Sequence, residues 1–421
     1  MLLSSYLKRA GGVGLIGILD RICGVFLGIL LARWLGADGY GVYAFVMAIV
    51  VLLLIPAEFG LPDWLMRHTA RNGGRSDVRL QRKVLQLVAF LGCSIAAISS
   101  LVVATFAADP AVATALIAGL WILPFRGLLN AVGFVLRGLG RARLAQIVHV
   151  LLPTLLALLV TGSAIFTGVP IKEPTFALGL RVVAVATALC AGFALLQSVQ
   201  SKPPKDLQLD IGLSTLLRAA FPFLLIGATT RLLSRTDVIM LGLLLGTREA
   251  GIYHIALQGA LVVQFAMNIS NTITTPEFAR LHAGGDPLLL QAHARMSARV
   301  VLVIGVPVAA LMIWFGEDLL IALFGTEFQG AATPLAVLAA GYLASFLFGA
   351  PGFLLNMTGH EKTAFRIYAV IAVGNVVLNA SLIPILGMMG AALATSIALI
   401  AQNLLLWQAA RRALGMSCAI V

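Results

Sequence analysis

Charge is scarce in this sequence. Lys, Arg, Asp and Glu make up 11% of the 421 residues, whereas about a quarter of the residues of a soluble globular domain are charged. Hydrophobic residues make up 60%, and no stretch between the apolar runs is long enough to form a soluble domain. The composition therefore excludes a soluble globular protein and indicates an all-α polytopic membrane protein.

Cysteine and histidine are also few. The four cysteines form no Cys-x-x-Cys pair, and the six histidines are scattered without the spacing of metal ligands. The sequence therefore predicts no disulfide framework and no metal site, and nothing in it indicates a cofactor.

What the sequence does contain is long apolar runs. A membrane-spanning helix needs about 20 mostly apolar residues, whereas a transmembrane strand needs about 10 in alternation. By the helical criterion we expect about twelve spans, over residues 11–35, 39–66, 82–107, 111–138, 144–167, 175–199, 212–246, 249–276, 291–316, 330–357, 362–385 and 388–410.

The net charge of +12 comes from basic residues in alternate loops, which is a signal of membrane orientation and not of nucleic-acid binding. Basic residues follow the second, fourth, sixth, eighth and tenth spans, at Arg67, Arg71, Arg75, Arg79, Arg82, Lys83, Arg137, Arg141, Arg143, Lys202, Lys205, Arg280, Arg295, Arg299, Lys362 and Arg366. By the positive-inside rule these loops and both termini are cytoplasmic.

The opening span returns in the second half of the chain. The stretch "LIGILDRICGVFLGILLARWLG" at 15–36 aligns with "LIGATTRLLSRTDVIMLGLLLG" at 225–246, and Tyr43 aligns with Tyr253. We therefore expect two six-helix lobes, 1–205 and 206–421. With an even number of spans in each, the lobes should be related by a pseudo-two-fold axis along the membrane normal, with a substrate site near mid-membrane.

Several charged residues lie deep within the predicted spans, where a charge costs about 2.5 to 3.5 kcal/mol and therefore indicates a bundle interior or a water-filled cavity. Four arginines are candidates for a central substrate-binding cavity: Arg21, Arg231, Arg235 and Arg126. A guanidinium binds phosphate oxygens through a planar fork of donors and stays charged. The alternative is that these arginines form structural ion pairs, with Asp20 or Asp237 as partners, or a polar pair of Arg126 with Asn130.

Three acidic residues in the spans, Asp20, Glu58 and Asp237, are candidates for ion coupling, by binding H⁺ or Na⁺, or for balancing the charge of the cavity arginines. Arg33 and Arg181 lie nearer to helix ends, so we expect them to extend to the membrane interface. The amides Gln264, Asn268, Asn271, Asn375 and Asn379 suit sugar hydroxyls or contacts between helices. The glycines of "LGADGYG" and "LGTREAG" predict tight turns between paired spans.

The sequence resembles the polysaccharide exporter branch of the multidrug/oligosaccharidyl-lipid/polysaccharide exporter superfamily, which includes the O-antigen and exopolysaccharide flippases. The resemblance rests on "LARWLGADGYGVYAF" and "AEFGLPDWLMRHTAR" in the first half, and on "RTDVIMLG", "GIYHIA", "PEFARL", "FGTEFQGAATPL" and "NVVLNASLIPILGMMGAALAT" in the second. It implies a flippase of the bacterial inner membrane. Such a flippase translocates undecaprenyl-diphosphate-linked oligosaccharide by alternating access, beside a polymerase and glycosyltransferases.

Two other functions fit parts of the pattern. A cavity dominated by carboxylates would suit the cationic drugs of an ion-coupled multidrug exporter of the related branch, whereas the balance of deep charges here, four arginines against three carboxylates, leans to an anionic cargo. A polysaccharide polymerase or ligase would need a sizeable external loop, and the predicted external loops are short. We therefore expect a transporter of an anionic lipid-linked cargo and not an enzyme.

Overall fold

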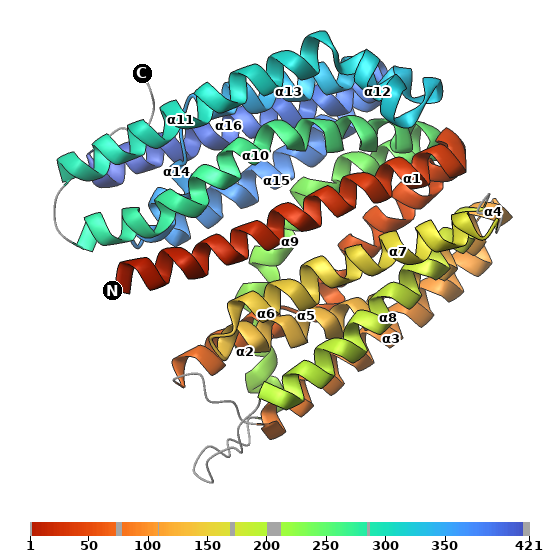
Figure 1. Cartoon of the computed structure of the whole chain (residues 1–421), viewed down its shortest axis with the longest axis horizontal. Coiled ribbons are helices and arrows are strands. Elements are labelled where there is room, and N and C mark those ends of the chain that lie inside the picture. Colours follow the sequence, from red (N-terminus) through yellow and green to blue (C-terminus); the bar gives the residue numbers. More distant parts are fainter. Residues whose placement is uncertain are drawn as a thin grey trace. The chain divides into compact units, whose positions relative to one another are not determined.

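The computed structural model describes residues 2–72, 78–107, 109–168, 173–199, 212–283 and 287–415, with only the backbone described in the first turns and in part of 266–287. All the regular secondary structure in these residues is helical, and they contain no strand (Figure 1). The prediction of an all-α polytopic membrane protein is confirmed.

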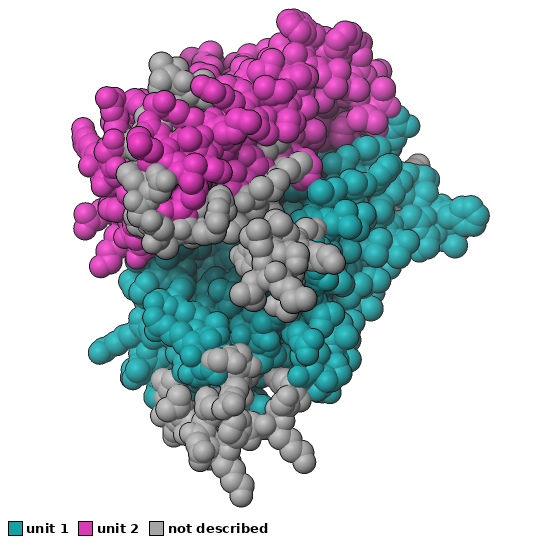
Figure 2. All heavy atoms as spheres, turned by 60° about the vertical axis from the view of Figure 1, so that its left-hand side comes forward, with its two compact units in different colours: residues 1–231 teal, residues 232–421 magenta. Residues whose placement is uncertain are grey.

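The chain divides into two compact units, residues 1–231 and 232–421 (Figure 2). The helices of the first unit are α1 Leu2–Glu58, α2 Leu61–Arg71, α3 Val78–Phe106, α4 Pro110–Leu120, α5 Ile122–Gly138, α6 Ala142–Gln146, the π-helical turn η1 Ile147–Leu151, α7 Leu152–Phe166, α8 Pro174–Val199 and the first part of α9 Leu213–Leu244. The predicted lobe boundary at 205/206 and the two-fold relation stay predictions.

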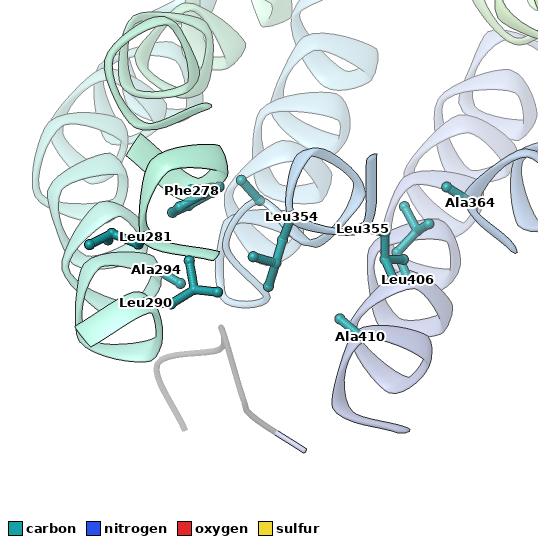
Figure 3. Packing of buried hydrophobic residues seen from close by; sticks show 10 residues of the cluster. Phe278, Leu281, Leu290, Ala294, Leu354, Leu355, Ala364, Leu406 and Ala410 are labelled. Atoms are coloured by element: carbon teal, nitrogen blue, oxygen red, sulfur yellow. The ribbon is translucent and has the colours of Figure 1, made fainter. Parts of the chain in front are cut away.

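The second unit contains the rest of α9 and the helices that follow it. These are α10 Thr247–Ala283, α11 Pro287–Trp314, α12 Gly316–Phe324, the 3₁₀ turn η3 Thr326–Ala331, α13 Ala332–Phe346, α14 Pro351–Met357, α15 Glu361–Leu386 and α16 Met388–Leu414. An apolar cluster joins the ends of five of them, with Phe278 of α10, Leu290 of α11, Leu354 of α14, Ala364 of α15 and Leu406 of α16 (Figure 3).

Within the described residues, nine helices are long and apolar enough to cross a membrane, or ten if the bent pair formed by residues 326–346 and 351–357 is one span. One of the nine, residues 14–58 of α1, covers most of the first two predicted spans. Its helix is broken between them at Gly36, which has φ 66° and ψ −178°. Gly246, the repeat equivalent of Gly36, has φ 114° between α9 and α10. The predicted glycine turns are therefore confirmed at equivalent places.

Other predicted spans contain breaks that hydropathy did not reveal. The span predicted over 39–66 is interrupted at Phe59 and Gly60, which have φ of 48° and 69°. The span predicted over 111–138 is divided into α4 and α5 at Trp121, and the one over 144–167 contains the π-helical turn η1. These breaks matter because charged residues lie beside them.

Candidate functional site

Glu58 is the centre of a polar group in the first unit. It is the last residue of α1 and only 5% of its surface is exposed. Asn130 Nδ2 of α5 donates a hydrogen bond of 2.6 Å to its Oε1, and Arg231 Nη2 of α9 forms an ion pair of 2.5 Å with its Oε2. Three side chains that the sequence marked separately therefore meet. Arg231 pairs with Glu58, whereas the structural partners expected for it were Asp20 and Asp237.

The local backbone brings α1 and α9 together at this point. Pro56 precedes Glu58, and the helix stops at Phe59 and Gly60. A Cβ atom at Gly60 would lie only 2.4 Å from the backbone nitrogen of Leu224 in α9. The absence of a side chain at Gly60 lets the α9 backbone pass close to the end of α1, two turns of helix before Arg231.

Further charges surround this pair. The half-buried Arg126 of α5 interacts electrostatically with Glu58, Asp20, Arg181 and Arg231. Asp20 of α1 in turn interacts with Arg126, Arg181 and the exposed Arg21. Asp20 Oδ1 is buried, and none of the described residues donates a hydrogen bond to it. We call this set of six side chains the unit-1 charge group: Asp20, Arg21, Glu58, Arg126, Arg181 and Arg231.

The unit-1 charge group contains four arginines and two carboxylates, so it keeps an excess of positive charge. Sequence reasoning placed Arg181 at the membrane interface and therefore outside the site. In the structure its Nη1 is buried, and its charge acts on Asp20 and Arg126. Its position in α8, far along the chain from the other members, gave no sequence signal for this grouping.

Asp237 forms a different, hydroxyl-rich group in the second unit. Its side chain is 2% exposed and accepts hydrogen bonds from Tyr253 Oη at 2.9 Å and from Thr395 Oγ1 at 3.5 Å, both at Oδ2. The charge of Arg235 also acts on Asp237. Although Arg231 and Arg235 are four residues apart, Arg231 therefore pairs with Glu58 while Arg235 acts on Asp237. The Asp237 carboxylate links α9 to α10 and α16.

The candidate amides give a mixed outcome. Asn379 Nδ2 donates to the backbone oxygen of Asn375 at 2.9 Å and to its Oδ1 at 3.1 Å, so these two buried amides bond within α15. The side chains of Asn268 and Asn271 lie outside the described residues. Within the part of the chain that the structure describes, no three His, Cys, Asp or Glu side chains are grouped to hold a metal ion.

Comparison with known proteins gives a match to one protein family and a set of solved structures with a similar fold. A family model described as "Polysaccharide biosynthesis protein" matches residues 30–333. No curated protein matches the sequence significantly.

The fold is similar to those of solved transporters. An inward-facing multidrug resistance MATE family transporter of the MOP superfamily has a TM-score of 0.72 and 14% identity, covering 94% of both chains. The lipid II flippase MurJ in an inward closed conformation has a TM-score of 0.72 and 14% identity, covering 94% of this chain and 87% of its own. A MOP superfamily transporter from Pyrococcus furiosus, whose binding pocket is described as having reverse polarity, has a TM-score of 0.64 and 12% identity, covering 96% of this chain and 94% of its own.

Proposed function

Because this chain belongs to the polysaccharide biosynthesis protein family, we propose that it is a flippase that carries a lipid-linked anionic oligosaccharide across the bacterial inner membrane. The cargo in this proposal is an undecaprenyl-diphosphate-linked oligosaccharide used for O-antigen or exopolysaccharide synthesis. The protein transports by alternating access, with both termini in the cytoplasm, and carries out no catalysis.

The observation that carries the proposal is the excess of arginine in the unit-1 charge group. Arg21 is exposed in the middle of an apolar helix, where contact with lipid would be costly. An aqueous or ligand contact at this depth avoids that cost. Guanidinium groups match the oxygens of a diphosphate in charge and in geometry, so this group suits an anionic linker and disfavours a cationic drug.

Glu58 has a specific role in this proposal. It binds Nη2 of the Arg231 guanidinium, so a phosphate that binds the same nitrogen competes with the Glu58 carboxylate. The displaced carboxylate keeps Asn130 as a hydrogen-bond donor but loses its counter-charge, and a buried unpaired carboxylate favours uptake of a cation or proton. H⁺ and Na⁺ both fit this step. Asp20 and Asp237 are the other candidates for ion coupling or charge balance.

The direct test replaces Arg21 or Arg231 by Ala. Transport of lipid-linked oligosaccharide should be abolished in the double variant while the protein still reaches the membrane, and Lys should rescue only partly because it lacks the planar fork. Surface polysaccharide in a strain that depends on this gene is the readout. Arg33→Ala, in the same helix but outside the charge group, is the matched control. Normal polysaccharide in the double Ala variant would refute the proposal.

The alternative is an ion-coupled multidrug exporter. The observation that favours it is the buried Asp237 carboxylate, which lies among hydroxyl groups that suit a proton or a cation. Resistance to cationic drugs on expression, lost in Asp237→Asn, would support it. Genes for a polymerase and glycosyltransferases beside this gene would support the flippase instead.

A further inference from the structure

Another arginine, outside the unit-1 charge group, is held by uncharged side chains at the end of α5. Arg137 lies in the last turn of this helix, and its Nη2 donates hydrogen bonds to Gln146 Oε1 at 2.9 Å and to His149 Nε2 at 3.1 Å. Its guanidinium carbon also lies 5.2 Å from the centre of the Phe134 ring. We call these three neutral partners the Arg137 cage.

The hydrogen bonds determine the protonation of His149. Its Nδ1 lies 2.5 Å from the backbone oxygen of Ala145, and because a carbonyl only accepts, Nδ1 must carry the hydrogen. Nε2 is then the lone-pair nitrogen that accepts from Arg137, whose guanidinium only donates. His149 is therefore neutral, so it orients Arg137 without cancelling its charge.

The backbone is shaped around His149. The residue belongs to the π-helical turn η1, Ile147–Leu151, and such turns are rare and occur frequently at functional sites. In α5, which packs against this turn, a Cβ atom at Gly133 would lie 2.6 Å from His149 Cγ. A glycine in α5 and a widened turn before α7 together provide the space in which the imidazole meets Arg137.

No carboxylate among the described residues forms an ion pair with Arg137. Asp63 of α2 acts on it electrostatically but is not hydrogen-bonded to it. Arginines within membrane spans normally pair with other charged residues or with backbone carbonyls. A guanidinium oriented by neutral partners instead keeps its attraction for an external anion.

The position of Arg137 indicates which anion is available. Arg137 is the penultimate residue of the apolar stretch Pro110–Gly138, so it lies where a membrane span ends and lipid phosphates begin. Arg141 and Arg143 follow in the same predicted cytoplasmic loop and are exposed. An arginine that merely extended to the interface would need no such cage.

We propose that Arg137 binds a lipid-borne phosphate at the predicted cytoplasmic end of α5, and that His149 and Gln146 position its guanidinium. Arg137 is not a member of the unit-1 charge group and lies eleven residues after Arg126 in α5, about 16 Å at the helical rise of 1.5 Å per residue. The two are linked electrostatically, because Asp63 interacts with Glu58 and Arg231 as well as with Arg137, and Arg126 interacts with His149. The phosphate belongs either to a prenyl diphosphate or to a phospholipid headgroup. The inference does not depend on the transport proposed above.

The experiment measures binding by the full-length protein in nanodiscs. In the first arm the discs contain only phosphatidylcholine, and geranylgeranyl diphosphate is titrated. In the second arm phosphatidylglycerol is added to the discs, and its enrichment around the protein is measured by native mass spectrometry. Both arms are repeated in Arg231→Ala protein, which removes the cationic group proposed for transport. Failure of that proposal and failure of this one are then distinguishable.

Arg137→Gln should weaken phosphate binding by about tenfold or more in one of the arms, because a charge-assisted hydrogen bond is lost. Arg141→Gln, which removes the same charge four residues further along the chain, in the connection between α5 and α6, should retain wild-type binding. His149→Leu should weaken binding while leaving the melting temperature without ligand close to that of wild type, and His149→Gln, which keeps an acceptor, should restore part of it.

Loss in the first arm identifies the prenyl diphosphate as the source, and loss in the second identifies the phospholipid. Wild-type affinity of Arg137→Gln in both arms, or equal loss in Arg141→Gln, would overturn the inference. If Arg137→Gln does not fold, Arg137→Lys decides the question. It keeps the charge but not the planar fork, so binding should fall, and wild-type binding would overturn the inference as well.

Discussion

At the scale of single residues, the Glu58–Arg231 pair shows why a charge can be retained inside an apolar helix. Removing one partner of a buried ion pair costs about 3 to 5 kcal/mol, because the other charge stays buried and unpaired. The Arg231 side chain remains 26% exposed, so we expect its own release from Glu58 to cost less. The proposed function requires that this pair open when a phosphate binds Arg231.

Replacing Glu58 by Gln tests this exchange. The amide retains the shape of the side chain and a hydrogen-bond acceptor for Asn130, but no longer competes with phosphate for Arg231. Geranylgeranyl diphosphate should bind about tenfold tighter, and transport should be slower because the release step loses its internal competitor. The binding affinity and the transport rate are measured together.

Glu361→Gln, at an exposed position in the first turn of α15, is the control and should change neither value. Weaker binding by Glu58→Gln, together with a lower melting temperature, would mean that Glu58 serves only to hold α1, α5 and α9 together.

At the scale of secondary-structure elements, breaks in the helices place the charged groups. The Phe59–Gly60 break follows Glu58 directly, and the π-helical turn carries His149. In an uninterrupted helix each side chain points about 100° away from the one before it. The breaks change the direction of the chain where it passes α9 and α5. The glycines at such breaks are needed either for a positive φ or for a close approach of another helix.

Gly60 should be intolerant of a side chain for both reasons. Gly60→Ala would place a Cβ 2.4 Å from the backbone nitrogen of Leu224, at φ 69°, and we expect a loss of roughly 3 kcal/mol or more in stability. Gly140→Ala separates the two causes, because Gly140 has φ 78° but nothing within 4 Å of its Cβ position. Thermal unfolding in detergent is the measurement. Equal melting temperatures for the two variants would show that the close approach to α9 is unimportant.

At the scale of the whole molecule, the distribution of charge predicts the orientation in the membrane. Among the connections that the structure describes, the short one between α5 and α6 carries Arg141, whereas Arg75, Lys202 and Lys205 of other predicted basic loops lie outside the described residues. The positive-inside rule then predicts that this connection is cytoplasmic and that the loop after α7 is external.

Single cysteines introduced at exposed positions test the orientation. In a background with the four native cysteines replaced by Ser, Thr167→Cys after α7 should react with a membrane-impermeant maleimide in intact spheroplasts, and Arg141→Cys only after permeabilisation. Labelling in the reverse order would contradict the predicted topology and the cytoplasmic placement of the termini.

The sequence by itself determined the class of protein, the internal repeat and the turns at Gly36 and Gly246, because these depend on composition and on patterns within a few helical turns. It also marked Glu58, Arg126 and Arg231 as charges too costly to face lipid.

Only the tertiary structure decided their partners. Glu58 and Arg231 are 173 positions apart, and no local pattern relates them. The electrostatic interaction of Arg181 with Asp20 and the hydrogen bond between Arg137 and the neutral His149 likewise have no local sequence pattern that predicts them. Helical periodicity states which side chains share a face, but which faces meet depends on helix packing and on breaks such as that at Gly60.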